Sequence, residues 1–284
     1  MVTVKKVTKK DSEKLLPLLF ELDSRKQTQD EWLGLFKAHW DDIENYFGYA
    51  MYDGENAVGF LGLLFSQRIL NNNLFKFCNV TSWVVKKEYR RYSLHLFFPV
   101  LELDNHTITV LTCNAGTQLI TKKLGFVDLE IGQRIILPLP ISLKFKTSTK
   151  IIYDLSDIEK NLNEETLKIF NDHRSLNCFH ILICGPEGKC YLIGSRTIKK
   201  NIPLVHIHYI SDHRFFSAHI NSLSGRICWR MKVFGILVDE RQLHGEAIFP
   251  SIYRRLSHPR VYKSDTLKSE DVDLLYSEYQ ILNL

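Results

Sequence analysis

The stretch that decides the fold is Glu88-Tyr89-Arg90-Arg91-Tyr92-Ser93-Leu94-His95, because the chain contains a second copy of its pattern. The second copy is Asp212-His213-Arg214-Phe215-Phe216-Ser217-Ala218-His219. Both copies read acid, aromatic or His, Arg, any residue, aromatic, Ser, small or apolar residue, His. Each copy follows an apolar, β-branched run, residues 79–85 or 202–210, and each leads into a segment of helical period.

A strand, a tight basic turn and a helix together form an anion-binding site, because the free N–H groups at a helix start point into the turn. We therefore predict two related α/β units, of which at least one is shaped to hold a phosphate. A second echo supports the duplication: residues 119–124 (LITKKL) and 251–256 (SIYRRL) share a pattern that we interpret as helical in both places. A repeat of this length indicates duplicated domains rather than a solenoid.

Composition indicates a globular protein. A chain of 284 residues is long enough for one large domain or two of ordinary size. The hydrophobic fraction of 45% and charged fraction of 24% are typical of soluble domains. No apolar run approaches the roughly 20 residues that cross a bilayer, and the basic N-terminus is not followed by the apolar region of a signal peptide. We expect no membrane partner.

Charge and cysteine usage limit the other classes. The six cysteines show no CxxC pair and no zinc spacing, which favours reduced thiols in a cytoplasmic protein. The net charge of +5 is mild, whereas nucleic-acid binders usually show a stronger basic stripe. The basic clusters are local (Lys86-Lys87, Arg90-Arg91 and Arg254-Arg255), and a polyanionic small ligand explains them as well as a nucleic acid does.

Periodicity predicts the following elements in the first half. We expect helices from Asp11, over 32–47, over 93–103 with Pro99 as a flaw, and over 114–124 with Gly125 as its stop. We expect strands over 49–52, 57–65, 74–85, 107–113 and 126–137.

The second half repeats this order. We expect helices over 163–171, after the second basic turn, over 251–256 and over 269–282, and strands over 179–184, 190–198, 203–210 and 233–239. The predicted domains are residues 1–140 and 141–284.

The first half resembles the GNAT acyltransferases (GCN5-related N-acetyltransferases) over residues 1–140. The resemblance lies in the order strand, Arg-x-x-small turn, helix, strand and Asn-containing helix, closed by Leu124-Gly125-Phe126. The turn from Tyr89 to Leu94 is similar to a variant found in double GNAT proteins among polysaccharide biosynthesis genes. The second half is similar only in outline. The resemblance implies an α/β (α+β) fold of two GNAT-like units, each a mixed, mostly antiparallel twisted sheet flanked by helices, the second degenerate.

The resemblance also implies a binding site for acetyl-CoA or another acyl-CoA. The family's pyrophosphate turn reads Gln/Arg-x-x-Gly-x-Gly/Ala, and here Arg90 takes the first position, Ser93 the first glycine and His95 the second. Glycine matters there because the backbone must approach phosphate closely. The implied donor-binding residues are Val84, Val85, Arg90, Arg91, Tyr92, Ser93, Leu94, His95 and Asn114.

The implied mechanism is direct acyl transfer. The strand over 80–85 would part from its neighbour, pair with the pantetheine arm and polarise the thioester through an N–H near Trp83 or Val84. The implied catalytic residues are Trp83, Asn114 and His95. Thr121 stands where many family members carry a tyrosine acid, and Tyr253 stands at the echoing position of the second half.

We do not interpret the histidines outside this turn as metal ligands or as a catalytic base. His206 and His208 alternate along one predicted strand near His213, but no third ligand has convincing spacing, so we expect a half-exposed strand face and no metal site. His39 lies on an apolar helix face and is interpreted as packed rather than as a catalytic base.

The function implied is transfer of an acyl group from acyl-CoA to an amine or hydroxyl of a small, sugar-type acceptor. One alternative is a non-catalytic protein of the same fold that binds CoA or another phosphate ligand. A second alternative is a transferase with a carrier-bound or aminoacyl-tRNA donor, which the modest net charge disfavours. The sequence leaves a homodimer open.

Overall fold

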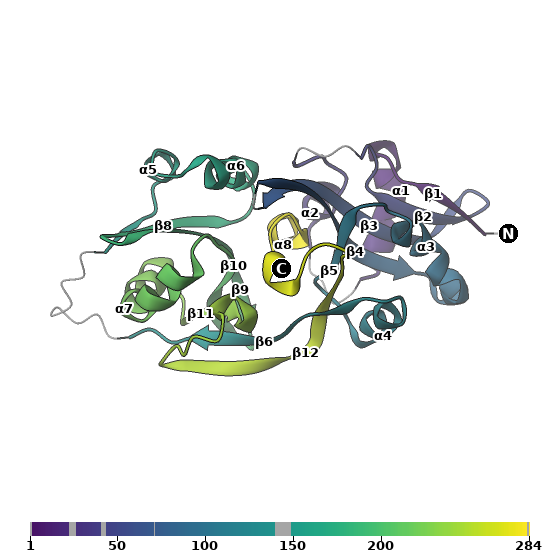
Figure 1. The fold of residues 1–284 in the computed structure, drawn as a ribbon. Helices are drawn as coiled ribbons and strands as arrows, with labels where there is room; N and C mark the ends of the chain where they lie inside the picture. The colour runs from purple at the N-terminus through teal and green to yellow at the C-terminus, as the bar shows by residue number, and fades with distance from the viewer. Residues whose placement is uncertain (1, 23–26, 41–43, 71, 140–148, 283) are drawn as a thin grey trace. The chain divides into compact units, whose positions relative to one another are not determined.

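The chain divides between two units, and the division does not follow sequence order. The structure, a computed structural model, describes residues 2–22, 27–40, 44–70, 72–139, 149–282 and 284. Unit 1 holds residues 1–127, 260–268 and 276–284, and unit 2 holds residues 128–259 and 269–275 (Figure 1).

Unit 1 is built on a mixed sheet in which only the β4–β5 pairing is parallel among the pairings that the structure describes. The order is β1-β2-β3-β4-β5-β12. The strands are β1 (Val2–Lys6), β2 (Gly48–Asp53), β3 (Asn56–Leu70), β4 (Asn73–Val85), β5 (His106–Val110) and the end of β12 (Ser251–Lys263).

Helices cover both faces of this sheet because side chains alternate along the strands. Leu61 and Leu63 of β3 share a core with Phe97, while Phe60 packs its ring 5.5 Å from Phe36 beyond helix α2. The helical segments of unit 1 are η1 (Lys9–Asp11), α1 (Ser12–Phe20), α2 (Gln29–Gly34), η2 (Lys87–Leu96), α3 (Phe98–Leu101), α4 (Ala115–Lys123) and α8 (Glu278–Ile281), where η denotes a 3-10 helix.

Unit 2 repeats the plan with one parallel pairing, β10–β11, among those that the structure describes. Its order is β12-β6-β11-β10-β9-β8-β7. The strands are β6 (Val127–Ile136), β7 (Lys150–Ile152), β8 (Phe179–Gly185), β9 (Gly188–Lys199), β10 (Ile202–Ile210), β11 (Gly235–Asp239) and the first part of β12. The helical segments are α5 (Leu155–Glu159), α6 (Glu164–His173), α7 (His213–Met231), η3 (Glu240–Leu243) and η4 (Ser269–Asp271).

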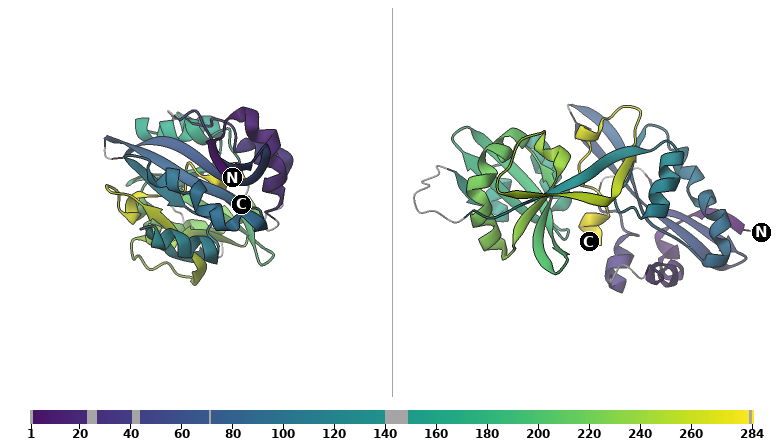
Figure 2. Two further views of the ribbon diagram at one scale, coloured as in Figure 1. Left: turned by 90° about the vertical axis from the view of Figure 1, so that its right-hand side faces the viewer. Right: turned by 90° about the horizontal axis from the view of Figure 1, so that it is seen from below.

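The two faces of the unit 2 sheet carry different helices (Figures 1 and 2). Ile181 and Ile183 of β8 share a core with Phe216 and Ile220 of α7. On the other face His180 meets the Phe170 ring of α6 at 5.3 Å. This architecture confirms the predicted mixed, mostly antiparallel α/β class.

Each unit completes its sheet with a strand from the other half of the sequence. In unit 1, β5 pairs with residues 261–263 of β12, and in unit 2, β11 pairs with residues 133–136 of β6. The predicted boundary between residues 140 and 141 therefore does not coincide with the units. Residues 140–148, around that boundary, lie outside the described part of the chain.

One predicted helix is wrong for a local reason. The chain over 93–103 forms the end of η2 and then the four-residue α3, not one α-helix. Pro99 lacks an N–H and its ring would clash with the carbonyl four residues earlier, so it is disfavoured inside a long helix and lies instead in the first turn of α3. The helix expected over 32–47 is also wrong, because α2 ends at Gly34; residues 41–43 lie outside the described chain.

The predicted helical echo is wrong as well. Residues 251–256 begin strand β12, and 269–282 contains only η4 and α8. Backbone pairing, which local pattern does not reveal, decides the conformation of β12. The duplication is supported instead by the shared strand order of the two units.

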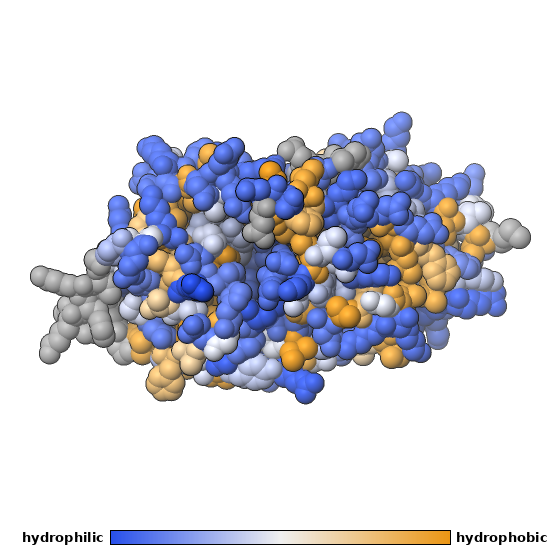
Figure 3. Space-filling model, in the orientation of Figure 1, coloured by the Kyte–Doolittle hydropathy of each residue, from blue (hydrophilic) through white to orange (hydrophobic). Residues whose placement is uncertain are grey.

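Among the described residues, no helix is both long and apolar enough to cross a bilayer. The face drawn in Figure 3 is largely hydrophilic, with apolar side chains scattered over it.

The strand exchange makes a prediction about fragments. Residues 1–140 and 141–284, produced separately, each lack a sheet strand of their own unit, so each is expected to be unfolded or aggregated. Produced together, they should reconstitute the folded protein, because all strands are then present. Circular dichroism and gel filtration of the separate and combined fragments test this. A folded, monomeric 1–140 fragment would contradict the exchange.

Buried His180 predicts acid sensitivity. Its Nδ1 lies 2.6 Å from Tyr191 Oη, and burial lowers its pKa to about 4. The unfolded chain, with an ordinary pKa near 6.5, binds the proton first, so stability falls as the pH drops from about 6.5 towards 4. Urea unfolding should show a His180 contribution of about 2 kcal/mol lost between pH 7 and pH 5.

His180→Phe should flatten part of that pH dependence, whatever its effect at pH 7. His258→Gln is the matched control, because His258 is exposed. An unchanged pH slope in His180→Phe would show that the stability loss comes from other groups.

Candidate functional site

The candidate site begins where β4 parts from β5. The parallel ladder joins Lys76–Asn79 to His106–Thr109 and ends there. β4 continues to Val85, and no described residue of β5 pairs with residues 80–85. An unpaired strand edge presents N–H and C=O groups that an extended ligand can bind. The parting predicted for this strand is thus present.

A β-bulge lies in the parted segment. Phe60 and Gly62 of β3 pair with Val84 and Thr81 of β4, so Leu61 faces both Ser82 and Trp83. Ser82 has a φ of 52°, a left-handed conformation that costs energy for a non-glycine residue. Bulges re-aim the backbone and are common beside active sites.

Trp83 contributes an unpaired donor at this place. Its ring packs 5.1 Å from that of Phe97. Its Nε1 is buried and makes no hydrogen bond to any described residue. A buried indole N–H without an acceptor is costly, so an oxygen of a bound molecule would stabilise it.

The basic bend follows β4 as a 3-10 helix, Lys87–Leu96. Tyr89 anchors it, because its hydroxyl donates to Asp53 Oδ2 at 2.8 Å. After the first turn, each N–H of such a helix is used within the helix. The converging amides expected from a strand–turn–α-helix are therefore replaced by a bend whose cationic side chains, not its N–H groups, are available.

Those side chains lie in solvent. Arg90, Arg91 and His95 are exposed, and neither arginine pairs with a carboxylate of the described chain. The Arg91 guanidinium lies 4.7 Å from the centre of the Tyr92 ring, which stacks on His95 at 5.8 Å. An exposed arginine pair suits phosphate, because a guanidinium can donate two parallel hydrogen bonds. His95 contacts aromatic side chains and lies on the surface.

Asn114 and Thr121 form hydrogen bonds that stabilise helix α4. Asn114 caps the helix, accepting from the Thr117 N–H at 2.8 Å. Thr121 is fully buried and donates back to the Thr117 and Gln118 carbonyls at 2.9 and 3.1 Å. Thr121 thus offers no proton donor to the site, and the Asn114 amide N–H₂ remains the group able to reach a ligand.

Glu278 is a residue that sequence reasoning missed. Its backbone N–H donates to Asn79 Oδ1 at 3.3 Å, beside the last paired residue of β4. Its carboxylate accepts from the Thr112 hydroxyl at 2.7 Å, just beyond the end of β5. The side chain is fully buried. The tail of unit 1 therefore brings a carboxylate to the point where the two strands part.

The equivalent opening in unit 2 is filled by the protein. The parallel ladder of β10 and β11 ends at His206. Beyond it, the His208 carbonyl accepts from Leu274 N at 3.2 Å and Gln242 Nε2 at 3.3 Å. Asp212 caps α7 by accepting from Phe215 N at 2.9 Å, so its negative charge occupies the place an anion would take. Unit 2 thus lacks the opening that unit 1 has.

The histidines of β10 are buried, contrary to the half-exposed strand face expected for them. His206 and His208 are 2% and 0% exposed, and their rings meet at 4.9 Å. His206 Nε2 lies 3.7 Å from Asp239 Oδ1, and His208 Nε2 lies 3.2 Å from Ser195 Oγ. Among the described residues no group of three or more His, Cys, Asp or Glu side chains is placed to hold a metal ion.

The structure thus gathers part of the predicted site. Val84 and Val85 end β4 and lead directly into η2 with Arg90, Arg91, Tyr92, Ser93 and Leu94. Trp83 lies in the bulged segment, and Asn114 follows the end of β5. Because β4 and β5 are parallel, their carboxyl ends meet at one edge of the sheet. His39 instead packs, with Nε2 2.7 Å from the Gly34 carbonyl.

The comparisons with known proteins concern the fold. No protein-family model matches the sequence, and a search of curated proteins finds no match. A GCN5-related N-acetyltransferase from Anabaena variabilis superposes with a TM-score of 0.61 at 12% identity, over 92% of this chain and 72% of that one. A GCN5-related N-acetyltransferase from Kribbella flavida gives 0.58 at 11% identity, over 93% and 71%. The chain has the fold of GCN5-related N-acetyltransferases.

Proposed function

We propose that the protein transfers an acyl group from acyl-CoA to an amine or hydroxyl of a small acceptor. The observation that carries the proposal is the parting of β4 from β5 after Asn79, with a bulge at Ser82 and a basic bend directly beyond. We assign the donor to unit 1, because the corresponding opening in unit 2 is filled by Gln242 and Leu274.

The donor would lie along the open edge of β4. The amide groups of a pantetheine arm can pair with the free backbone groups of residues 80–85, as an added strand would. The phosphates would then reach the bend, where Arg90 and Arg91 carry exposed, unpaired positive charge. A backbone N–H near Trp83 or Val84 would polarise the thioester carbonyl and stabilise the tetrahedral oxyanion.

Acyl transfer needs proton movements as well. The acceptor nitrogen or oxygen attacks the carbonyl carbon, the new C–N or C–O bond forms, and the C–S bond breaks. Glu278 is the carboxylate at the opening, and we assign it the acceptor's proton. The thiolate leaves as CoA; Thr121 cannot protonate it, because it is buried and bonded to its own helix.

Acetyl-CoA is the donor and a sugar-type amine or hydroxyl the acceptor in the simplest form of this proposal. The alternative, a protein that binds CoA without catalysis, is favoured by one observation: the position at which many family members carry a tyrosine acid holds the buried Thr121. The enzyme and the CoA-binding protein would both bind the donor at the same place, so an assay of acyl transfer is needed to distinguish them.

Donor binding is tested by thermal shift. Acetyl-CoA at 100 times its Kd should stabilise the protein by about 2.7 kcal/mol and raise Tm accordingly. Arg90→Ala combined with Arg91→Ala should remove most of that rise, because the phosphates lose their paired charges.

The matched control is Arg254→Ala combined with Arg255→Ala, which removes the same charge from β12. That variant should keep the full rise in Tm. If no CoA species shifts the wild-type Tm, or if both double variants respond alike, unit 1 is not the donor site.

The role of Glu278 is tested kinetically. Glu278→Gln keeps a group that accepts from Thr112, so the fold and donor binding should be retained. The rate of CoA release with an acceptor should fall about 10²- to 10⁴-fold, the usual contribution of a general base.

Glu102→Gln, the same charge change at an exposed position of unit 1, should leave the rate unchanged. A Glu278→Gln enzyme that releases CoA at the wild-type rate would exclude Glu278 as the base. Donor binding without turnover in the wild type, over a panel of amines and sugars, would support the CoA-binding protein.

A further inference from the structure

One end of unit 2 exposes large apolar side chains that the proposed function does not use. They lie where the hairpin of β9 and β10 turns and where α7 leads into β11. Four are exposed there: Ile198 at 71%, Ile202 at 42%, Trp229 at 76% and Phe234 at 60%. Large apolar side chains are mostly buried in a folded domain, so a group of them at one end of a sheet indicates a binding surface.

Backbone pairing brings these residues to the same end of the sheet. Ile198 lies opposite Pro203 in the hairpin. The Phe234 N–H donates to the Pro203 carbonyl at 2.8 Å, so the start of β11 lies beside the hairpin. Because β10 and β11 are parallel, α7 must return the chain to the start of β11, and Trp229 lies in its last turn.

The hairpin turn is tight and presents its apolar neighbours to solvent. Lys200 and Asn201 join the strands with φ values of 51° and 64°, as in a two-residue type I′ turn. This turn matches the natural twist of paired strands, so it is a favoured hairpin connection. Ile198 and Ile202 therefore lie on strands that flank a defined tip.

The same end of unit 2 is basic. Residues 196–203 and 226–234 hold six Lys or Arg residues and no Asp or Glu. Arg226 and Arg230 contact residues that flank β7. The other four cations lie in the hairpin or directly after α7: Arg196, Lys199, Lys200 and Lys232. Like charges repel, so this surface disfavours a second copy of itself and favours an anionic partner.

We propose that this end of unit 2 binds the surface of a membrane that contains anionic phospholipid. The negative surface potential of such a membrane attracts nearby Lys and Arg side chains. Ile198 and Ile202 would enter the boundary between headgroups and acyl chains, where Trp229 also fits because Trp is enriched there. The aliphatic tip favours acyl chains over nucleic acid, whose bases stack on aromatic rings.

Surface binding of this kind does not need a helix that spans the bilayer. The expectation from sequence that there is no membrane partner rests on the absence of a spanning run, and it does not address a surface formed by tertiary contacts. The proposal concerns unit 2 alone and holds whether or not unit 1 binds acyl-CoA.

Sedimentation of the full chain with lipid vesicles tests the proposal. Phosphatidylcholine vesicles with about one third phosphatidylglycerol should bind the protein, and pure phosphatidylcholine vesicles should bind it at least tenfold more weakly, because they lack surface charge. Raising the salt concentration should weaken binding. No binding to the anionic vesicles, or equal binding to both kinds, would overturn the proposal.

Tryptophan fluorescence shows whether this end makes the contact. Trp229 is exposed, whereas Trp32 and Trp40 are buried and Trp83 is half-buried. Anionic vesicles should shift the emission to shorter wavelength, because the Trp229 indole leaves water. Trp229→Phe should still bind the vesicles but lose that shift. A shift that persists in Trp229→Phe would place the contact elsewhere and refute the proposal.

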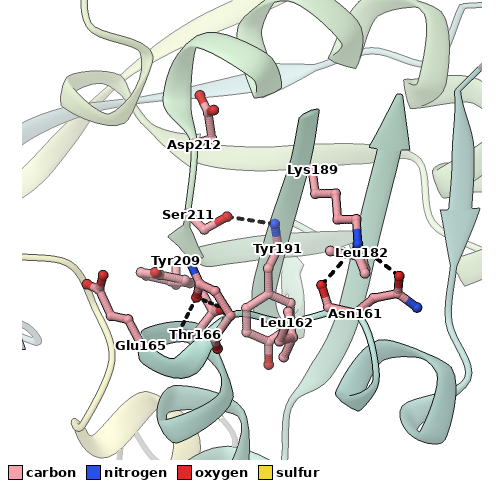
Figure 4. A pocket seen from close by; sticks show the side chains of 11 residues that line it. Asn161, Leu162, Glu165, Thr166, Leu182, Lys189, Tyr191, Tyr209, Ser211 and Asp212 are labelled. Atoms are coloured by element: carbon pink, nitrogen blue, oxygen red, sulfur yellow. Dashed lines mark hydrogen bonds between the residues drawn. The ribbon is translucent and has the colours of Figure 1, made fainter. Parts of the chain in front are cut away.

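Paired charge variants locate the basic residues. Lys200→Asn combined with Lys232→Asn should weaken binding about 30-fold, and Asn tolerates the positive φ of both positions. The matched control is Lys160→Asn combined with Lys189→Asn, which removes two exposed charges from unit 2. Lys189 lies near the other end of β9, in the wall of a cavity beside α6 (Figure 4), roughly 30 Å along the strand from the hairpin tip. The control should bind as the wild type does, and an equal loss in both double variants would contradict the proposed surface.

The apolar contribution has its own test. Ile198→Thr combined with Ile202→Thr keeps β-branched residues in both strands, so the hairpin should be retained with little change in Tm. Binding to anionic vesicles should weaken about tenfold, because less apolar area leaves water. Unchanged binding would show that the hairpin tip does not enter the bilayer and would sink the proposal.

Discussion

The feature on which the candidate site depends is the shortness of the parallel ladder between β4 and β5. Four residue pairs join the two strands, and then β4 continues for six more residues that pair with β3 but not with any described residue of β5. The backbone groups of such an edge normally pair with a neighbouring strand, because a buried N–H or C=O without a partner costs free energy. Here the bulge at Ser82 turns the strand, so the edge stays open beside the basic bend.

Comparison of the two units shows that this opening is a property of particular side chains and not of the fold alone. Both units part their parallel strands, but in unit 2 the Gln242 side chain and the Leu274 N–H donate hydrogen bonds to the carbonyl of His208. The second basic turn is likewise changed, because Asp212 caps the helix that follows. In unit 1 the edge of β4 beyond Asn79 is thus not paired with β5, whereas in unit 2 the corresponding carbonyl of β10 is bonded by residues of its own unit.

Most strands of this fold could be predicted from sequence, because alternation and β-branched runs report them directly. Gly125 also behaved as expected, because it has a φ of 90° and follows Leu124, the C-cap of α4. The partners of β6 and β12 could not be predicted, since a hydrophobic pattern indicates a strand but does not identify its neighbour. The bend after residue 86 was predicted as a turn before an α-helix, and Pro99 alone carried the signal that this helix is interrupted.

The candidate site was predictable where chemistry lies in a local motif. Arg90 and Arg91 were found because they form a compact basic cluster after a strand. Glu278 could not be found, since nothing in its neighbours distinguishes it from a solvated glutamate. Only the tertiary path of the tail places it against Asn79 and Thr112.

Unit 1 is built from residues 1–127 together with residues that follow 259, so the order of synthesis affects when its core can be completed. Unit 1 begins the chain, but its last sheet strand and the buried segment from Tyr276 to Leu282 come after residue 259. A ribosome therefore releases nearly all of unit 2 before unit 1 has every part of its core. The half of the protein that is made first finishes folding last, and its incomplete sheet edge needs shielding while translation continues.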